Sequence, residues 1–223
     1  AMAGGGNGLM PGEVSLACHG VLFMDEFNLF STKTVEVLRQ PMESGHILID
    51  RVNGKVEYPA DFMLVAAMNP CKCGYYPDRN RCSCTPAQVR AYFGRLSRPL
   101  LDRIDVCVQV PRIKYEDMVY DGKDLYTNEY MRSTVERVFN IQKERFADEK
   151  YSLNSAIPAA DVSRYCILDR EAENLMNSIY DSCDLSARGY HKLLKVARTI
   201  ADIDGSEYIM AEHICEASGY RMV

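Results

Sequence analysis

Two short apolar segments, each followed directly by polar residues, constrain the fold of this chain more than any other feature. Val21–Met24 precedes Asp25 and Glu26, and Phe62–Met68 precedes Asn69. Their apolar residues run continuously instead of alternating with polar ones, which is typical of strands buried on both faces of a parallel sheet. Because such strands deliver their last residues to one carboxyl edge, where α/β proteins bind ligands, we expect both acids and the asparagine at that edge.

A hairpin is predicted over residues 47–58, because Asn53-Gly54 is a strong two-residue turn signal between two strand-like segments. With this turn Asp50 would face Glu57, an unfavourable pair of like charges. We therefore expect the hairpin to project into solvent or toward a partner. Basic residues flank its tip, and they could contact a nucleic-acid backbone or remain solvated. These residues are Arg51 and Lys55.

The second half of the chain has a different character, and we place a domain boundary after residue 115. Residues 1–115 mix strand and helix patterns, including a helix over residues 86–95 and a strand over residues 106–110, whereas residues 116–223 show amphipathic helices alone. The predicted fold class is α/β, with a partial parallel-sheet core followed by an all-helical domain. Helices of that domain are expected at 125–147, 158–165, 169–182, 186–203 and 210–220.

Composition excludes several classes of function. The net charge is −5, from 26 basic and 31 acidic residues, which argues against binding nucleic acid by bulk charge but leaves a local basic patch open. Neither apolar segment approaches the roughly 18 residues that a membrane-spanning helix needs, so no membrane partner is expected. Nine cysteines, four of them crowded into residues 71–84, fit the reducing cytoplasm better than a secreted disulfide framework.

The crowded cysteines have the spacing of a metal site. Cys71, Cys73, Cys82 and Cys84 lie within 14 residues, and a glycine and a proline between them allow the chain to turn back. Four thiolates arranged in this way suit tetrahedral Zn²⁺ in a structural role. The C-x-C spacing is tighter than the usual C-x₂-C, and two disulfides or free thiols are the alternatives.

The polar residues behind the two apolar segments suit a Mg²⁺-nucleotide site. Asp25 could orient the metal, Glu26 could polarise an attacking water, and the amide of Asn69 could hold that water or a γ-phosphate. The alternatives are acids that cap a strand in solvent and an Asn-Pro turn. An arginine-rich segment follows at residues 90–105. Its arginines either pair with nearby aspartates or stabilise charge on a neighbouring subunit's nucleotide, as arginine fingers do.

The order of these segments resembles that of AAA+ ATPases. VLFMDE resembles a Walker B strand, LVAAMNP a sensor-1 strand and RPLLDRID the finger segment. LSARGYHKLLKVARTIADIDG is similar to the sensor-2 helix of the magnesium-chelatase-related AAA+ proteins of the ComM/YifB type. The resemblance extends across nearly the whole chain through further sequence segments. These are PGEVSLACHGVLFMDE, LRQPMESG, YPADFMLVAAMNPCKCGYY and LSRPLLDRIDVCVQVP.

The resemblance implies a role for each candidate site residue. Asp25 and Glu26 match the Mg²⁺-binding and water-activating acids, and Asn69 matches sensor 1. Arg103 matches the finger that acts in trans, and Arg188 matches the sensor-2 arginine. By the same resemblance the hairpin is an insert turned toward the pore of a ring, and the helical domain is a lid. The implied cofactors are ATP and Mg²⁺, and the implied partner is the protein itself in a hexameric ring.

The same resemblance implies a function, with one departure. No G-x-x-x-x-G-K-[ST] phosphate loop is present in the sequence, so we expect the C-terminal part of a longer protein that is inactive as an ATPase by itself. The full-length protein is expected to remodel DNA as a helicase or branch-migration factor, in recombination or natural transformation. The alternatives are a chelatase-type subunit that drives metal insertion by a partner protein, and a zinc-stapled interaction module.

Overall fold

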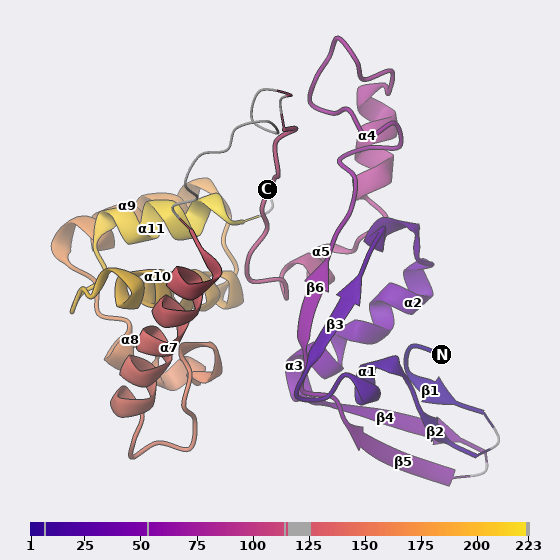
Figure 1. Ribbon diagram of the computed structural model, residues 1–223, viewed down its shortest axis with the longest axis horizontal. Coiled ribbons are helices and arrows are strands. Elements are labelled where there is room, and N and C mark those ends of the chain that lie inside the picture. Colours follow the sequence, from indigo (N-terminus) through magenta and orange to yellow (C-terminus); the bar gives the residue numbers. More distant parts are fainter. Residues whose placement is uncertain (7, 53, 114, 116–125, 222–223) are drawn as a thin grey trace. The chain divides into compact units, whose positions relative to one another are not determined.

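A computed structural model describes residues 1–6, 8–52, 54–113, 115 and 126–221. The chain divides into two compact units, Ala1–Ile104 and Asp105–Val223 (Figure 1). The first mixes strands and helices, and the second is helical, as expected from the sequence. The boundary predicted after residue 115 adjoins residues 116–125, which lie outside the described part. In the described part of the chain, no helix is both long and apolar enough to cross a membrane.

A parallel pair of strands forms the centre of the first unit (Figure 1). β3 (Val21–Met24) runs beside β6 (Met63–Ala66), with Met24 paired to Ala66. On one face, Met24 is buried in a core with residues of the surrounding helices and loops. The parallel register of β3 and β6 confirms the predicted pairing. The core residues are Val14, Met24, Phe27, Val35, Leu38, Ile47, Ala60, Leu96 and Leu100.

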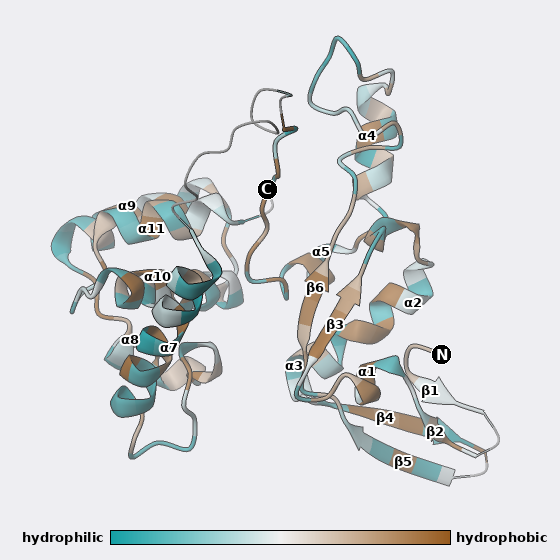
Figure 2. Cartoon of the chain, viewed as in Figure 1, coloured by the Kyte–Doolittle hydropathy of each residue, from teal (hydrophilic) through white to brown (hydrophobic). Residues whose placement is uncertain are grey.

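The expectation that both faces of these strands are buried is wrong. The residues of the other face are 57% exposed at Val21, 61% at Phe23, 64% at Met63 and 40% at Val65. The cause is that β3 and β6 form a two-stranded sheet among the described residues, and the core cluster covers one side of it. Figure 2 shows both strands coloured as hydrophobic along their length.

The predicted hairpin is present, but its register differs from the expected one. β4 (His46–Arg51) pairs with β5 (Gly54–Pro59), and Arg51 faces Gly54. Gly54 therefore belongs to β5 and not to the predicted Asn53-Gly54 turn, and Asn53 itself lies outside the described residues. Asp50 faces Lys55 instead of Glu57. This register replaces a like-charge pair by an opposite-charge pair.

Helices and a second small hairpin complete the first unit. Residues 71–84 form a loop, and α4 (Pro86–Phe93) follows it where a helix is predicted. Thr85 caps α4 reciprocally with Gln88. We call residues 71–95 the cysteine arm, because they stand out from the rest of the unit (Figure 1). The other elements are β1 (Gly4–Gly5), β2 (Met10–Pro11), α1 (Glu13–Leu16), α2 (Thr32–Glu36), α3 (Pro41–Ser44) and α5 (Arg98–Leu101).

The strand predicted over residues 106–110 does not form. Val106, Val108 and Val110 are 50%, 67% and 80% exposed. Cys107 donates one backbone hydrogen bond to the carbonyl of Tyr220, at 2.7 Å, and the described residues offer this segment no ladder partner. An apolar run becomes a strand only where a neighbouring strand satisfies its backbone groups.

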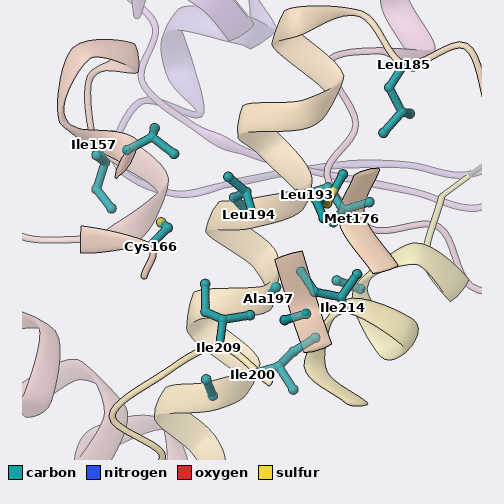
Figure 3. Close-up of a cluster of buried hydrophobic side chains, with 14 of the residues drawn as sticks. Ile157, Cys166, Met176, Leu185, Leu193, Leu194, Ala197, Ile200, Ile209 and Ile214 are labelled. Atoms are coloured by element: carbon teal, nitrogen blue, oxygen red, sulfur yellow. The ribbon is translucent and has the colours of Figure 1, made fainter. Parts of the chain in front are cut away.

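The second unit is a helical bundle packed around its longest apolar helix. α10 (Ala187–Asp204) begins behind Ser186, whose hydroxyl accepts from the Gly189 N–H at 3.0 Å. Its apolar face buries Leu193, Leu194, Ala197 and Ile200 against neighbouring helices (Figure 3). The predicted helices are present, although residue 125, where the first was expected to begin, lies outside the described residues. The others are α7 (Asn128–Arg145), α8 (Val162–Tyr165), α9 (Arg170–Ser182) and α11 (Ala211–Gly219).

A buried ion cluster joins α7 and α10. Asp202 and Arg198 are 1% and 2% exposed, and the Arg198 Nε lies 3.1 Å from the Asp202 Oδ1. Arg145 and Asn154 each donate to the Asp202 Oδ2 at 2.8 Å. Burial raises the pKa of Asp202, but the hydrogen bonds from Arg145 and Asn154 and the arginine charges outweigh burial, so the pKa lies below its usual value.

Candidate functional site

The acids Asp25 and Glu26 lie immediately beyond the carboxyl end of β3, and both are exposed. Asp25 Oδ1 accepts a hydrogen bond from the Glu26 backbone N–H at 2.8 Å. Glu26 has φ 49° and ψ 41°, the left-handed region that residues other than glycine, asparagine and aspartate avoid. Such strained positions concentrate at functional sites, because the surrounding structure must hold them.

The backbone brings Asn69 to the same end of the sheet. The pairing of β3 and β6 continues past both strands. The Ala67 N–H donates to the Met24 carbonyl, and the Phe27 N–H donates to the Ala67 carbonyl, each at 2.9 Å. Asn69 follows two residues later and is exposed. Both acids and the asparagine therefore lie at one carboxyl edge, while their roles remain predictions.

Asn28 is a residue of this edge that the sequence analysis missed. It is 1% exposed, and among the described residues neither its Nδ2 nor its Oδ1 has a hydrogen-bond partner. A buried amide without partners is costly, so this group is a candidate for a binding or catalytic role. Its signal in the sequence is a polar residue inside the apolar run Phe27–Phe30.

Arg103, the predicted finger, is held inside its own chain. Its guanidinium forms an ion pair with Glu43 of α3. Its Nη1 also donates to the carbonyl of Pro99 at 2.5 Å, and its side chain is 11% exposed. The Nε is buried without a hydrogen-bond partner among the described residues. Action on a neighbouring subunit would therefore require this contact to open.

Arg188 lies in the second unit, at the second position of α10, and is exposed. Lys192 lies one turn further along the helix. Burial lowers its pKa, and the charges of Arg188 and Arg221 lower it further. The Asp105 carboxylate, whose Oδ1 lies 2.8 Å from the Lys192 Nζ, raises the pKa but does not outweigh these effects. These cations gather near the N-terminus of a long helix, where the helix dipole is also positive. The arrangement suits an anion such as a phosphate.

The four cysteines predicted to bind metal come together in the cysteine arm. Their sulfurs all lie within 4.8 Å of one another. Cys71 Sγ is 3.3 Å from Cys73 Sγ and 3.8 Å from Cys82 Sγ. Cys73 Sγ and Cys82 Sγ are 3.6 Å apart. Tetrahedral Zn²⁺ with bonds of about 2.3 Å places its sulfurs about 3.8 Å apart, so the cluster fits this ion. No disulfide joins any of the nine cysteines, so the structure contains neither of the alternative disulfides.

The thiols of the cluster have unequal acidities. The backbone N–H of Tyr75 lowers the pKa of Cys73 to about 6, against the opposing effect of burial. Burial and the neighbouring sulfurs raise the pKa of Cys82 to about 11. Gly74, with φ 81°, allows the tight turn that directs backbone N–H groups toward these sulfurs. Ionising four thiols this close together requires a cation between them.

Comparison with known proteins identifies the family. The family described as magnesium chelatase, subunit ChlI, matches residues 1–118, and the C-terminal part of the same subunit matches residues 126–221. The chain belongs to the magnesium-chelatase ChlI family.

Several curated proteins are similar to this ChlI-family chain. Competence protein ComM of Haemophilus influenzae is 41% identical to it over 222 residues. YifB of Escherichia coli is 40% identical over 223 residues. The magnesium-chelatase 38 kDa subunit of Acidiphilium rubrum is 24% identical over 217 residues. These alignments cover 99%, 100% and 96% of this chain, but 42% of ComM, 43% of YifB and 55% of the chelatase subunit. The chain therefore spans less than half the length of ComM and YifB.

Proposed function

We propose that this chain is the acid-bearing part of a ring-forming AAA+ ATPase that couples ATP hydrolysis to DNA remodelling. The observation that carries the proposal is the meeting of Asp25, Glu26 and Asn69 at one carboxyl edge of a parallel strand pair. In this proposal Asp25 orients Mg²⁺, which neutralises charge on the phosphates. Glu26 accepts a proton from the attacking water, and the Asn69 amide positions that water or the γ-phosphate.

The remaining site residues act in the assembled protein. The phosphate loop that this sequence lacks would be supplied by another part of the full-length protein, so the chain alone would not hydrolyse ATP. Arg103 would leave Glu43 and reach a neighbour's nucleotide in a hexameric ring, and Arg188 would contact a phosphate from a helical lid. Residues 1–115 would form the ATPase core and residues 116–223 the lid.

The relatives support two interpretations of the substrate, which are DNA and a metal-inserting partner protein. The relative named a competence protein is 41% identical, whereas the chelatase subunit is 24% identical. The greater similarity supports DNA as the substrate, through helicase or branch-migration activity in recombination or natural transformation. The second candidate is a chelatase-type subunit that drives metal insertion by a partner protein, which the family match favours.

For the four-cysteine site we propose structural Zn²⁺. The sulfur spacing supports this, and four protein ligands leave no coordination position open for catalysis. The ion would fix the loop between β6 and α4. A cluster of free thiols also favours a reducing compartment, and we place the protein in the cytoplasm.

The decisive experiment uses the full-length protein and its Glu26→Gln variant. We expect the variant to lose ATP hydrolysis and keep ATP binding, because the amide cannot accept the proton from water. Undiminished turnover would refute the assignment of Glu26. Forked or four-way DNA should stimulate the wild-type ATPase, whereas a chelatase subunit should show no response to DNA.

A further inference from the structure

The cysteine arm carries a charge opposite to that of the whole chain. Its 25 residues include five basic residues and a single acid, whereas the chain has a net charge of −5. Binding a divalent metal to four thiolates would still leave the arm at about +2. The basic residues, all exposed, are Lys72, Arg79, Arg81, Arg90 and Arg95.

These positive charges are not neutralised by the described residues of the chain. In the part that the structure describes, no carboxylate pairs with any of the five. The Arg79 guanidinium instead lies 5.2 Å from the centre of the Tyr76 ring, and that of Arg81 lies 5.6 Å from the centre of the Tyr75 ring. Uncompensated cations on an exposed surface attract a polyanion, with release of its counterions.

Aromatic rings are interleaved with the charges. Tyr75 is 48% exposed. Tyr92 of α4 lines a groove of about 570 Å³ together with Lys72 and Arg95, between the cysteine loop and the helix. Cations that follow a backbone, alternating with rings on which bases can stack, are the features of surfaces that bind single-stranded nucleic acid without sequence preference.

We infer that the cysteine arm is a binding surface for single-stranded DNA, with its cations on the phosphates and Tyr75 stacked on a base. This deepens the proposed function, on which the choice of DNA rests. An exposed ring favours a single strand, because a duplex keeps its bases stacked inside. It disfavours an acidic protein partner, which has no bases to stack. The proposed zinc then serves to hold the arm's rings and charges in one geometry.

The test measures binding of a labelled 20-nucleotide oligo-dT to the 223-residue chain by fluorescence anisotropy at 50 mM salt. The combined variant Lys72→Ala, Arg79→Ala, Arg81→Ala should bind at least about tenfold more weakly. The slope of log affinity against log salt should fall by about 2, since each lost phosphate contact on a single strand contributes about 0.7. The matched control removes three exposed cations elsewhere and should bind like wild type. These are Lys33, Arg132 and Lys143.

A second pair of variants tests the stacking ring. Tyr75→Ala should weaken binding by roughly 5- to 150-fold, the range seen for one stacked base, whereas Tyr75→Phe should bind like wild type. A duplex of equal length and inorganic polyphosphate should both bind more weakly than oligo-dT. Equal loss in the control variant, tighter binding to duplex or polyphosphate, or an unaffected Tyr75→Ala variant would each overturn the inference.

Folding and function are kept separate in this test. If the triple variant loses its circular-dichroism signal, photocrosslinking of wild type to an iodouracil-substituted oligonucleotide decides instead, and the crosslinked peptide should lie within residues 71–95. A crosslink confined to other residues, or no binding by wild type, overturns the arm inference. Stimulation of the full-length ATPase by DNA, with normal binding by the arm variants, would uphold the proposed function alone.

Discussion

Arg95, at the base of the cysteine arm, donates a hydrogen bond from Nη1 to the backbone carbonyl of Asn28, 3.4 Å away. Asn28 follows Glu26 by two residues in the segment after β3. One side chain thus ties the arm to the segment that carries the candidate water-activating acid. The contact joins residues 67 positions apart, so it belongs to the folded unit and not to local sequence.

Arg95→Ala should lower the free energy of unfolding by about 0.5–1.5 kcal/mol, the usual contribution of one hydrogen bond. Urea unfolding of the 223-residue chain measures this change. Arg90→Ala is the control, because Arg90 is exposed on the same arm, and its effect should stay within about 0.5 kcal/mol. Equal effects of the two substitutions would show that the bond to Asn28 contributes nothing.

Glu26→Asn should stabilise the chain while removing the acid. Asparagine enters the left-handed region more easily than glutamate, so we expect a gain of roughly 0.5–1 kcal/mol at a residue with φ 49°. Glu26→Val, which is β-branched, should instead destabilise the chain by more than about 1 kcal/mol. Thermal melting of both variants checks the sign, and a loss of stability in Glu26→Asn would contradict the strain argument.

Freshly reduced wild-type chain should contain about one zinc ion per molecule. Cys71→Ser should abolish zinc binding, whereas Cys183→Ser should retain it, because Cys183 lies outside the cluster and is exposed. Chelation should make the arm sensitive to trypsin, since its order would depend on the ion. Metal-free protein with a protease-resistant arm would argue against the zinc proposal.

Asp202→Asn should destabilise the chain by about 3 kcal/mol or more, because it leaves buried Arg198 without a charged partner. The folded-state pKa of Asp202 lies below its ordinary value, so the ionised carboxylate stabilises the fold above that ordinary pKa. The stability difference between wild type and variant should be constant above about pH 5 and shrink as the pH falls below about 4. Exposed Asp181 provides the control, as Asp181→Asn. A difference independent of pH would contradict this account.

Glu43→Ala should release Arg103 from its ion pair. The guanidinium would then become exposed, and trypsin should cleave after Arg103 several-fold faster than in wild type. Cleavage followed by mass spectrometry measures the rate. Glu144→Ala removes an exposed acid elsewhere and should leave that rate unchanged. Unchanged cleavage in Glu43→Ala would mean that Glu43 does not restrain the arginine.

The sequence predicted most helices, because their signals are local. The caps Ser186 and Thr85 precede α10 and α4 directly, and the apolar periodicity of each helix lies within the helix itself. The placement of Asp25 and Asn69 at one edge was also predictable, since both follow apolar strands. In each of these cases a short stretch of chain contains the information.

The features that sequence reasoning missed depend on distant partners. The hairpin register depends on cross-strand pairs such as Asp50 with Lys55, and the turn signal alone favoured the wrong pairing. The apolar run at 106–110 lacks a ladder partner among the described residues. Arg103 meets Glu43 across 60 positions, so no local pattern revealed that the predicted finger is held.

The exposed side of the β3–β6 sheet has a practical consequence for handling this protein. The exposed side chains of this sheet form an apolar strip beside strand edges that are open in the described part of the chain. They are Val21, Phe23, Met63 and Val65. Such surfaces favour self-association through edge pairing, more strongly at high concentration. Purification of the 223-residue chain is therefore best carried out dilute and cold, and hydrophobic resins will retain it through this strip.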